Sequence, residues 1–235
     1  MQGDQEPGFP HLQPCGDQAL TVTFSASLHA AANRRACAFA ARLREQGWPF
    51  VTDVVNGFTT VSVHYRAAER SDAQMRAQLW EQLSDSEPDT ATLGRLVEIP
   101  VCYGGEHGPD LDALARRSGV PARTLIERHA AQTVQVFMLG FAPGLPYLGL
   151  WDEPAFKVAR RETPRERVPA GSVAVANGQG VIYPVEIPGG WHLIGRTPLT
   201  LFRPTHAESP ALLAPGDRVR FVPISPQEFA QHGRD

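Results

Sequence analysis

The chain has 235 residues, 42% of them hydrophobic, which is enough to form one large domain or two small ones around packed cores. Its formal net charge of −3 gives no basic surface for nucleic acid or for an anionic membrane. The three cysteines lack the spacing of a disulfide framework or a zinc site, and no apolar run of about 18 residues occurs. We therefore expect a cytoplasmic protein that binds small molecules or other proteins.

The first part of the chain predicts a small α+β unit. Residues 18–25 alternate apolar and polar side chains, as a half-exposed strand does, and residues 30–46 carry one apolar helical face. Residues 49–66 form two β-rich runs around Asn-Gly at 56–57, a pair that tolerates the positive φ angles of a type I′ hairpin turn. A second amphipathic helix is expected at 72–83. This order favours helices on one face of an antiparallel sheet.

A linker is predicted at 84–92, because SDSEPDTAT holds no large apolar residue. We therefore expect two domains, residues 1–86 and 93–235. The second begins with a strand at 95–101 and a glycine-rich loop, after which Asp110 is placed to cap a helix at 111–118. Pro121 suits the first turn of another helix that runs to about residue 131.

From Thr133 onward, short apolar runs are separated by Gly and Pro turns. The runs are TVQVFML, SVAVA, VIYPV, WHLI, LTLF and DRVRFVPI. Their number and spacing predict a closed or nearly closed β-barrel. The segment Ser225-Pro226-Gln227-Glu228 has the pattern of a capping box, which predicts a short terminal helix.

Several kinds of chemistry are disfavoured. The chain has no GxxxxGK[ST] loop for nucleotide phosphates, although the loop from Gly104 to Gly108 leaves a phosphate site before a helix as an alternative. The eight histidines show no paired metal-ligand spacing, so no metal is expected. Ser172 lacks the GxSxG nucleophile elbow and is expected to satisfy a turn. Cys102 is expected to be a buried structural cysteine.

Two segments carry the candidate binding residues. In 159–172, prolines hold the backbone extended while arginines project, so Arg165 and Arg196 are candidates for a carboxylate or phosphate clamp. The alternative is a solvated basic face. In 187–198, Gly189 and Gly190 let a ligand approach the main chain beside Trp191, unless Trp191 plugs the end of the barrel.

The stretch LGFAPGLPYLGL, residues 139–150, combines three glycines, two prolines and five large apolar side chains. A loop this stiff loses little conformational entropy on binding. It is therefore expected to form the rim of a ligand pocket or a subunit interface.

Four motifs occur in order along the chain: VCYGGEHGPDL, MLGFAPGLPYLG, TPRERVPAGSVAVANGQGVIYP and IPGGWHLIGRTPLTLF. Together they resemble the family of 5-oxoprolinase B subunits, formerly called allophanate hydrolase subunit 1. That family also includes KipI-type inhibitors of a sporulation histidine kinase. The resemblance runs from about residue 16 to about residue 225.

The resemblance implies a small N-terminal α+β domain followed by a cyclophilin-like β-barrel domain. It implies two partners, namely the paralogous barrel protein that serves as the C subunit and a separate A subunit. The implied reaction is the ATP-dependent opening of the 5-oxoproline lactam to glutamate, with ATP bound by the complex at a site that the sequence does not locate. The chain is expected to be inactive alone, and no catalytic residue is assigned.

Alternatives stay open. The chain is also compatible with a KipI-like protein that binds and inhibits a sensor histidine kinase. Related barrels in urea carboxylase suggest a protein that acts on a urea-like or allophanate-like amide, and the cyclophilin-like barrel alone suggests a proline isomerase. Five residues of the expected site depart from the family's usual pattern and leave the substrate open: Leu145, Asn177, Gly180, Val181 and Ile187.

The residues expected to form a substrate site or a subunit interface come from the motifs above. They are Phe141, Pro143, Gly144, Pro146, Tyr147, Arg165, Ser172, Tyr183, Pro188, Gly189, Gly190, Trp191, Arg196 and Thr197.

Overall fold

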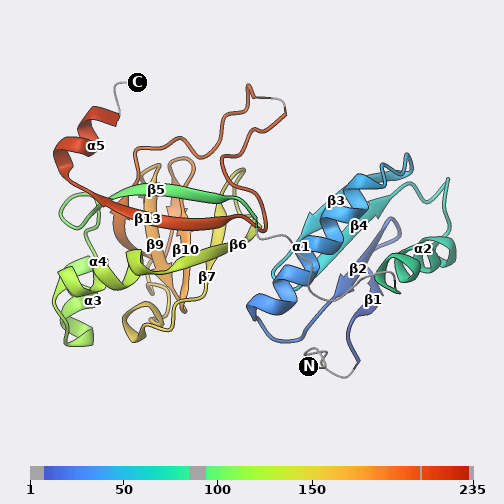
Figure 1. Ribbon diagram of the computed structural model, residues 1–235, viewed down its shortest axis with the longest axis horizontal. Coiled ribbons are helices and arrows are strands. Elements are labelled where there is room, and N and C mark those ends of the chain that lie inside the picture. The colour runs from blue at the N-terminus through green and yellow to red at the C-terminus, as the bar shows by residue number, and fades with distance from the viewer. Residues whose placement is uncertain (1–7, 85–93, 207, 233–235) are drawn as a thin grey trace. The chain divides into compact units, whose positions relative to one another are not determined.

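The computed structural model describes residues 8–84, 94–206 and 208–232. The chain divides into two compact units, Met1–Leu93 and Gly94–Asp235, and Figure 1 shows a sheet with helices in the first and a barrel in the second. This confirms the predicted α+β class with a closed barrel. The predicted linker lies outside the described residues except for Ser84, so the domain boundaries stay predictions.

The first unit is built on a four-stranded antiparallel sheet in the order β1-β2-β4-β3. Its strands are β1 (His11–Pro14), β2 (Ala19–Thr23), β3 (Val51–Asn56) and β4 (Thr60–Tyr65). Side chains alternate between two faces, so that Leu20, Val22, Val61 and Val63 enter the core while Thr21 and Ser62 hydrogen-bond on the other face. The sequence did not predict β1, which pairs with β2 at the sheet edge.

Two helices, α1 (Ala30–Glu45) and α2 (Asp72–Ser84), cover the apolar face of this sheet (Figure 1). Phe39 of α1 and both Met75 and Leu79 of α2 are buried in one cluster with the strand residues. Both helices therefore lie on the same face, as the periodicity predicts.

The β3–β4 hairpin is confirmed, but the predicted type I′ turn is wrong. Neither Asn56 nor Gly57 has a positive φ angle, and the loop between the strands is three residues long. Asn56 remains in the strand because its side chain is 5% exposed and its Oδ1 accepts a hydrogen bond of 2.7 Å from Arg44 of α1. A tertiary contact thus moves the turn by one residue.

The second unit is a closed barrel with strand order β10-β7-β6-β13-β5-β12-β9. The strands are β5 (Leu96–Tyr103), β6 (Thr133–Leu139), β7 (Pro146–Gly149), β9 (Ser172–Ala176), β10 (Gln179–Ile182), β12 (His192–Arg196) and β13 (Arg218–Ile224). The neighbours β5 and β13 are parallel, and Figure 1 shows them side by side. The strand predicted at LTLF is wrong, since only an isolated bridge joins Phe202 to Ala211.

Three α-helices and one 3₁₀ turn accompany the barrel strands in the described part of this unit. They are α3 (Leu111–Ser118), α4 (Ala122–Ala131), the 3₁₀ turn η1 (Pro154–Phe156) and α5 (Pro226–His232). The capping box is confirmed: the Glu228 N–H donates to Ser225 Oγ, and the Ser225 N–H donates to Glu228 Oε2 at 2.7 Å. Pro121 occupies the N-cap position of α4 and so precedes its first turn.

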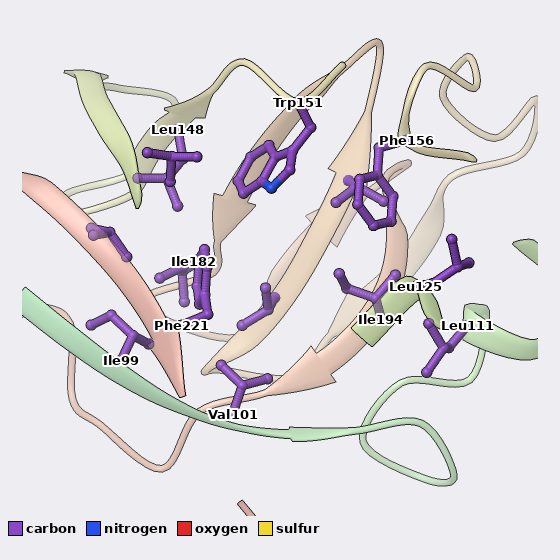
Figure 2. Close-up of a cluster of buried hydrophobic side chains, with 14 of the residues drawn as sticks. Ile99, Val101, Leu111, Leu125, Leu148, Trp151, Phe156, Ile182, Ile194 and Phe221 are labelled. Atoms are coloured by element: carbon purple, nitrogen blue, oxygen red, sulfur yellow. The ribbon is translucent and has the colours of Figure 1, made fainter. Parts of the chain in front are cut away.

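Apolar side chains from every strand of the barrel fill its interior. Figure 2 shows several of them, among them Ile99, Leu148 and Phe221. Trp151, Phe156 and Phe221 are the largest fully buried rings of this interior. His129 of α4 is also fully buried here, stacked on Trp151 at 4.8 Å between ring centroids.

A second apolar cluster covers the outer face of the barrel wall. In the fully buried strand SVAVA, Val173 and Val175 belong to the interior core, whereas Ala174 belongs to the outer cluster. This outer cluster consists of Leu145, Val168, Ala174, Val181, Tyr183 and Leu193. Two short strands that the sequence did not predict, β8 (Arg165–Val168) and β11 (Ile187–Gly189), pair with each other beside it.

Candidate functional site

A cavity of about 740 Å³ lies on the outer cluster and therefore outside the barrel interior. Its volume is in the range of small-molecule sites. It is lined by Phe141, Leu145, Tyr147, Ala159, Arg160, Arg161, Pro164, Asn177, Val181, Tyr183, Pro188, Gly189, Gly190 and Trp191. Four segments far apart in the sequence, from the 139–150 loop to β11, thus meet at one place.

Half of the residues expected from the sequence line this cavity. They are Phe141, Tyr147, Tyr183, Pro188, Gly189, Gly190 and Trp191. Three of the family departures, Leu145, Asn177 and Val181, line it as well. The other expected residues do not: Pro143, Gly144, Pro146, Arg165, Ser172, Arg196 and Thr197.

Three of those residues are buried for structural reasons. Ser172 is the first residue of β9 and is 1% exposed, and its N–H donates to the Pro169 carbonyl at 3.2 Å, which closes the turn that precedes the strand. Thr197 is 2% exposed, and its Oγ1 accepts the N–H of Leu199. Gly144 has a φ angle of 76° and lies against the Phe202 ring. These residues support the strands and loops behind the cavity.

Aromatic side chains form one wall of the cavity. Trp191 meets Tyr147 edge to face, with 6.1 Å between ring centroids. Trp191 packs on the outer cluster and not inside the barrel, so it does not plug the barrel end. The Tyr183 hydroxyl lies against Gly189, in the space that a side chain would take. That glycine therefore makes room for a tyrosine.

Burial raises the pKa of both tyrosines at the cavity further above physiological pH. It raises the pKa of Tyr183 to about 12, against the opposing effects of a backbone hydrogen bond from Trp191 and of the Arg165 charge. Burial also raises the pKa of Tyr147, while the Arg160 charge acts in the opposite direction. Both phenols are therefore neutral at physiological pH.

The arginines at the cavity differ from those expected. Arg160 and Arg161 line it, whereas Arg165 Nη2 donates to Asp110 Oδ1 at 2.8 Å and Arg196 Nε donates to the Ala170 carbonyl at 2.7 Å. The expected Arg165–Arg196 clamp is thus not formed around this cavity. The arginine-rich stretch 159–172 does contain cavity-lining residues, as the sequence predicts. Sequence periodicity could not show which of its side chains turn toward the cavity.

Asp110 precedes α3 as expected, but its side chain makes no capping hydrogen bond, so that expectation is wrong. Its carboxylate instead accepts hydrogen bonds from Arg165 and from the Leu193 N–H. These partners come from segments distant in sequence, which is why local pattern reasoning misses them.

Strained backbone gathers at the cavity. Among the described residues, the non-glycine residues with positive φ are Phe141, at 69°, and Asn177, at 53°, and both line it. A bulky side chain rarely adopts this conformation, and such strain is often retained at functional sites. Phe141 is also 72% exposed, so its ring stands at the mouth of the cavity.

Other sequence-based alternatives find less support. The amides of Gly104 and Asp110 donate to the β12 carbonyls of Ile194 and Leu193, and the amide of Gly108 donates to the Gly104 carbonyl, so these three donors are already used by main-chain acceptors. The described residues contain no cluster of three or more potential metal ligands. Cys102 is buried, and burial raises the pKa of its thiol. None of the described helices has the length and apolar character needed to cross a membrane.

Residues 10–213 match the family model described as carboxyltransferase domain, subdomain C and D, which gives the class of the domain. The chain is 37% identical to the 5-oxoprolinase B subunit of Bacillus subtilis over 93% of its own length and 94% of the relative's. It is 40% identical to the 5-oxoprolinase B subunit of Escherichia coli O157:H7 over 88% and 93%. The chain therefore belongs to the family of 5-oxoprolinase B subunits.

Solved structures agree on the fold. TTHA0988 superposes with a TM-score of 0.78 at 36% identity over 88% of this chain, which spans 40% of the length of TTHA0988. The urea amidolyase of K. lactis superposes with a TM-score of 0.75 over 94% of this chain and 15% of the enzyme, at 17% identity. At that identity the second likeness shows a shared fold alone.

Proposed function

We propose that the chain is the B subunit of an ATP-dependent 5-oxoprolinase, and that it acts with a paralogous barrel protein, the C subunit, and with an A subunit to convert 5-oxoproline to glutamate. The observation that carries this proposal is the identity of 37% to a 5-oxoprolinase B subunit over nearly the full length of both chains. The three free cysteines fit a location in the reducing cytoplasm.

We further propose that the outer cavity binds 5-oxoproline, a small lactam ring that carries a carboxylate. Arg160 lines the cavity and forms no ion pair with the described residues, so its guanidinium is available to a carboxylate. The planar guanidinium offers two parallel hydrogen bonds to such a group. Trp191 and Tyr147 supply an apolar wall for the ring.

The cavity supplies binding groups more readily than catalytic ones. Its described lining residues include no carboxylate and no histidine, so a general base would come from another part of the complex. The glycine-rich loop is a poor candidate for nucleotide phosphates, because the amides of Gly104, Gly108 and Asp110 already donate to backbone carbonyls. We therefore assign ATP to the complex and derive no phosphoryl transfer step from these residues.

Replacing Arg160 tests the placement of the substrate. In the reconstituted complex, Arg160→Gln is expected to raise KM for 5-oxoproline about ten-fold or more, because one charge-assisted contact worth about 1.5–3 kcal/mol is lost. Arg167→Gln is the matched control, since Arg167 comes from the same segment, does not line the cavity and has an 83% exposed side chain. Equal KM values for both variants would contradict the placement.

A further inference from the structure

The carboxylate of Asp110 joins three elements of the barrel unit that are distant in sequence. Its Oδ1 accepts hydrogen bonds from Arg165 Nη2 at 2.8 Å and from Arg161 Nη1 at 3.4 Å. Its Oδ2 accepts the backbone N–H of Leu193 at 2.7 Å. The start of α3, the segment before and within β8, and strand β12 thus meet at one carboxylate.

Asp110 is itself fixed firmly on β12. It is 8% exposed, and its own N–H donates to the Leu193 carbonyl at 3.0 Å, so main chain and side chain both bond Leu193. A buried carboxylate is stable only when paired and hydrogen-bonded, and these contacts meet that requirement. The carboxylate therefore offers a rigid point that can hold a neighbouring segment in place.

The neighbouring segment is one wall of the cavity, residues 159–164. Two further hydrogen bonds hold this segment. The Arg161 N–H donates to the Gly190 carbonyl at 2.7 Å, and His192 Nε2 lies 2.9 Å from the Ala159 carbonyl oxygen. Arg165 has a buried Nη1 without a hydrogen-bond partner among the described residues. Without the Asp110 carboxylate, the Arg165 guanidinium would be a partly buried charge without a counter-charge, and we expect it to move toward solvent.

The geometry points to Asp110 as a positioning residue for the proposed 5-oxoproline site. Holding Arg161 and Arg165 fixes the segment between Ala159 and β8, and this turns the neighbouring Arg160 toward the cavity. Asp110 also neutralises part of the positive charge of this segment, so that among the described lining residues Arg160 is the cation without an ion pair and can bind a substrate carboxylate. This inference rests on the proposed function, because it concerns the same cavity.

The test compares Asp110→Asn with Asp217→Asn. Asp217 is a matched control: it is 6% exposed, pairs with Arg95 at 2.9 Å, accepts the Ala214 N–H at 2.8 Å and does not line the cavity. Both variants lose a buried charge in the same unit. Two quantities are measured. The first is the hydrogen exchange of residues 159–167 in the full chain, and the second is KM and kcat for 5-oxoproline in the reconstituted complex.

We expect Asp110→Asn to accelerate exchange in 159–167 at least about ten-fold and to raise KM more than it lowers kcat. Asp217→Asn should change neither the exchange of residues 159–167 nor KM. This holds even where the two variants have similar melting temperatures. Should Asp110→Asn fold poorly, Arg165→Gln removes the same ion pair from the other side and should give the same two effects.

Exchange rates and KM that match those of Asp217→Asn would overturn the inference. The KM of Arg160→Gln separates this failure from that of the proposed function. If Arg160→Gln raises KM and Asp110→Asn does not, Asp110 has no positioning role, but the proposal that the cavity binds 5-oxoproline stands. If neither variant changes KM, the cavity does not bind 5-oxoproline and both proposals fall.

Discussion

At the scale of single residues, His129 shows how burial selects one protonation state. It is fully buried in the barrel core, its Nδ1 lies 2.8 Å from the Tyr103 hydroxyl, and its Nε2 has no hydrogen-bond partner among the described residues. Burial lowers the pKa of its imidazole from 6.5 to about 3. The folded protein therefore requires the neutral ring.

This requirement predicts a loss of stability in acid. The unfolded chain takes up a proton at His129 below about pH 6.5, whereas the folded chain does so only near pH 3. Stability is thus complete above the unfolded pKa and falls as the pH decreases toward the folded one. Between about pH 7.5 and 5, the free energy of unfolding should drop by about 2 kcal/mol from this group alone.

Denaturant unfolding of the wild type and of His129→Gln at the two pH values measures the effect. The glutamine can still accept a hydrogen bond from Tyr103 but does not titrate, so the variant should lose about 2 kcal/mol less on acidification. The same pH dependence in both proteins would contradict the assignment to His129.

At the scale of elements, the small sheet of β8 and β11 fits against the barrel because Gly189 has no side chain. A methyl group there would overlap the hydroxyl and the ring of Tyr183, which is itself 2% exposed. Gly189→Ala should therefore lower the free energy of unfolding by about 1–3 kcal/mol and raise KM for 5-oxoproline. Thermal melting and steady-state kinetics measure the two effects.

The neighbouring glycine provides the control. A methyl group on Gly190 would have no heavy atom closer than 3.6 Å, and its φ angle is not positive. Gly190→Ala should thus change stability by less than about 0.5 kcal/mol. Equal losses of unfolding free energy in Gly189→Ala and Gly190→Ala would contradict this. They would mean that the close contact between Tyr183 and Gly189 does not control how the β8–β11 sheet packs against the barrel.

At the scale of the whole molecule, the chain is expected to bind substrate without converting it. The described cavity residues provide a guanidinium and an aromatic wall but no carboxylate or histidine to act as a base. Purified alone with ATP and 5-oxoproline, the chain should form no glutamate above background, and adding the A and C subunits should start the reaction. Glutamate formation by the chain alone, at the rate of the full set, would refute this.

Much of the fold could be predicted from local sequence. Helices α1 and α2 and the terminal capping box follow from periodicity and from cap residues, because these signals act over a few residues. The strands β1, β7, β8 and β11 have three or four residues each, too few for a period to be recognised. The closed barrel itself follows from the number and spacing of the longer runs.

The site divides in the same way. Local composition drew attention to the stiff loop at 139–150, the arginine-rich segment and the Gly189-Gly190-Trp191 stretch, and all three contribute to the cavity. Composition could not tell that Leu148 of the first stretch is fully buried in the barrel core. Nor could it tell that Arg165 turns to Asp110 while Arg160 lines the cavity.

The sequence by itself thus determined the family, the class of fold and the segments that form the site, since each depends on short patterns in a known order. The tertiary structure alone decided which face of each segment is used. Alternate residues of β9 enter the barrel core and the outer cluster, so one strand serves both. The partners of Asp110 lie 55 and 83 residues away along the chain, and only chain closure brings them within hydrogen-bonding distance.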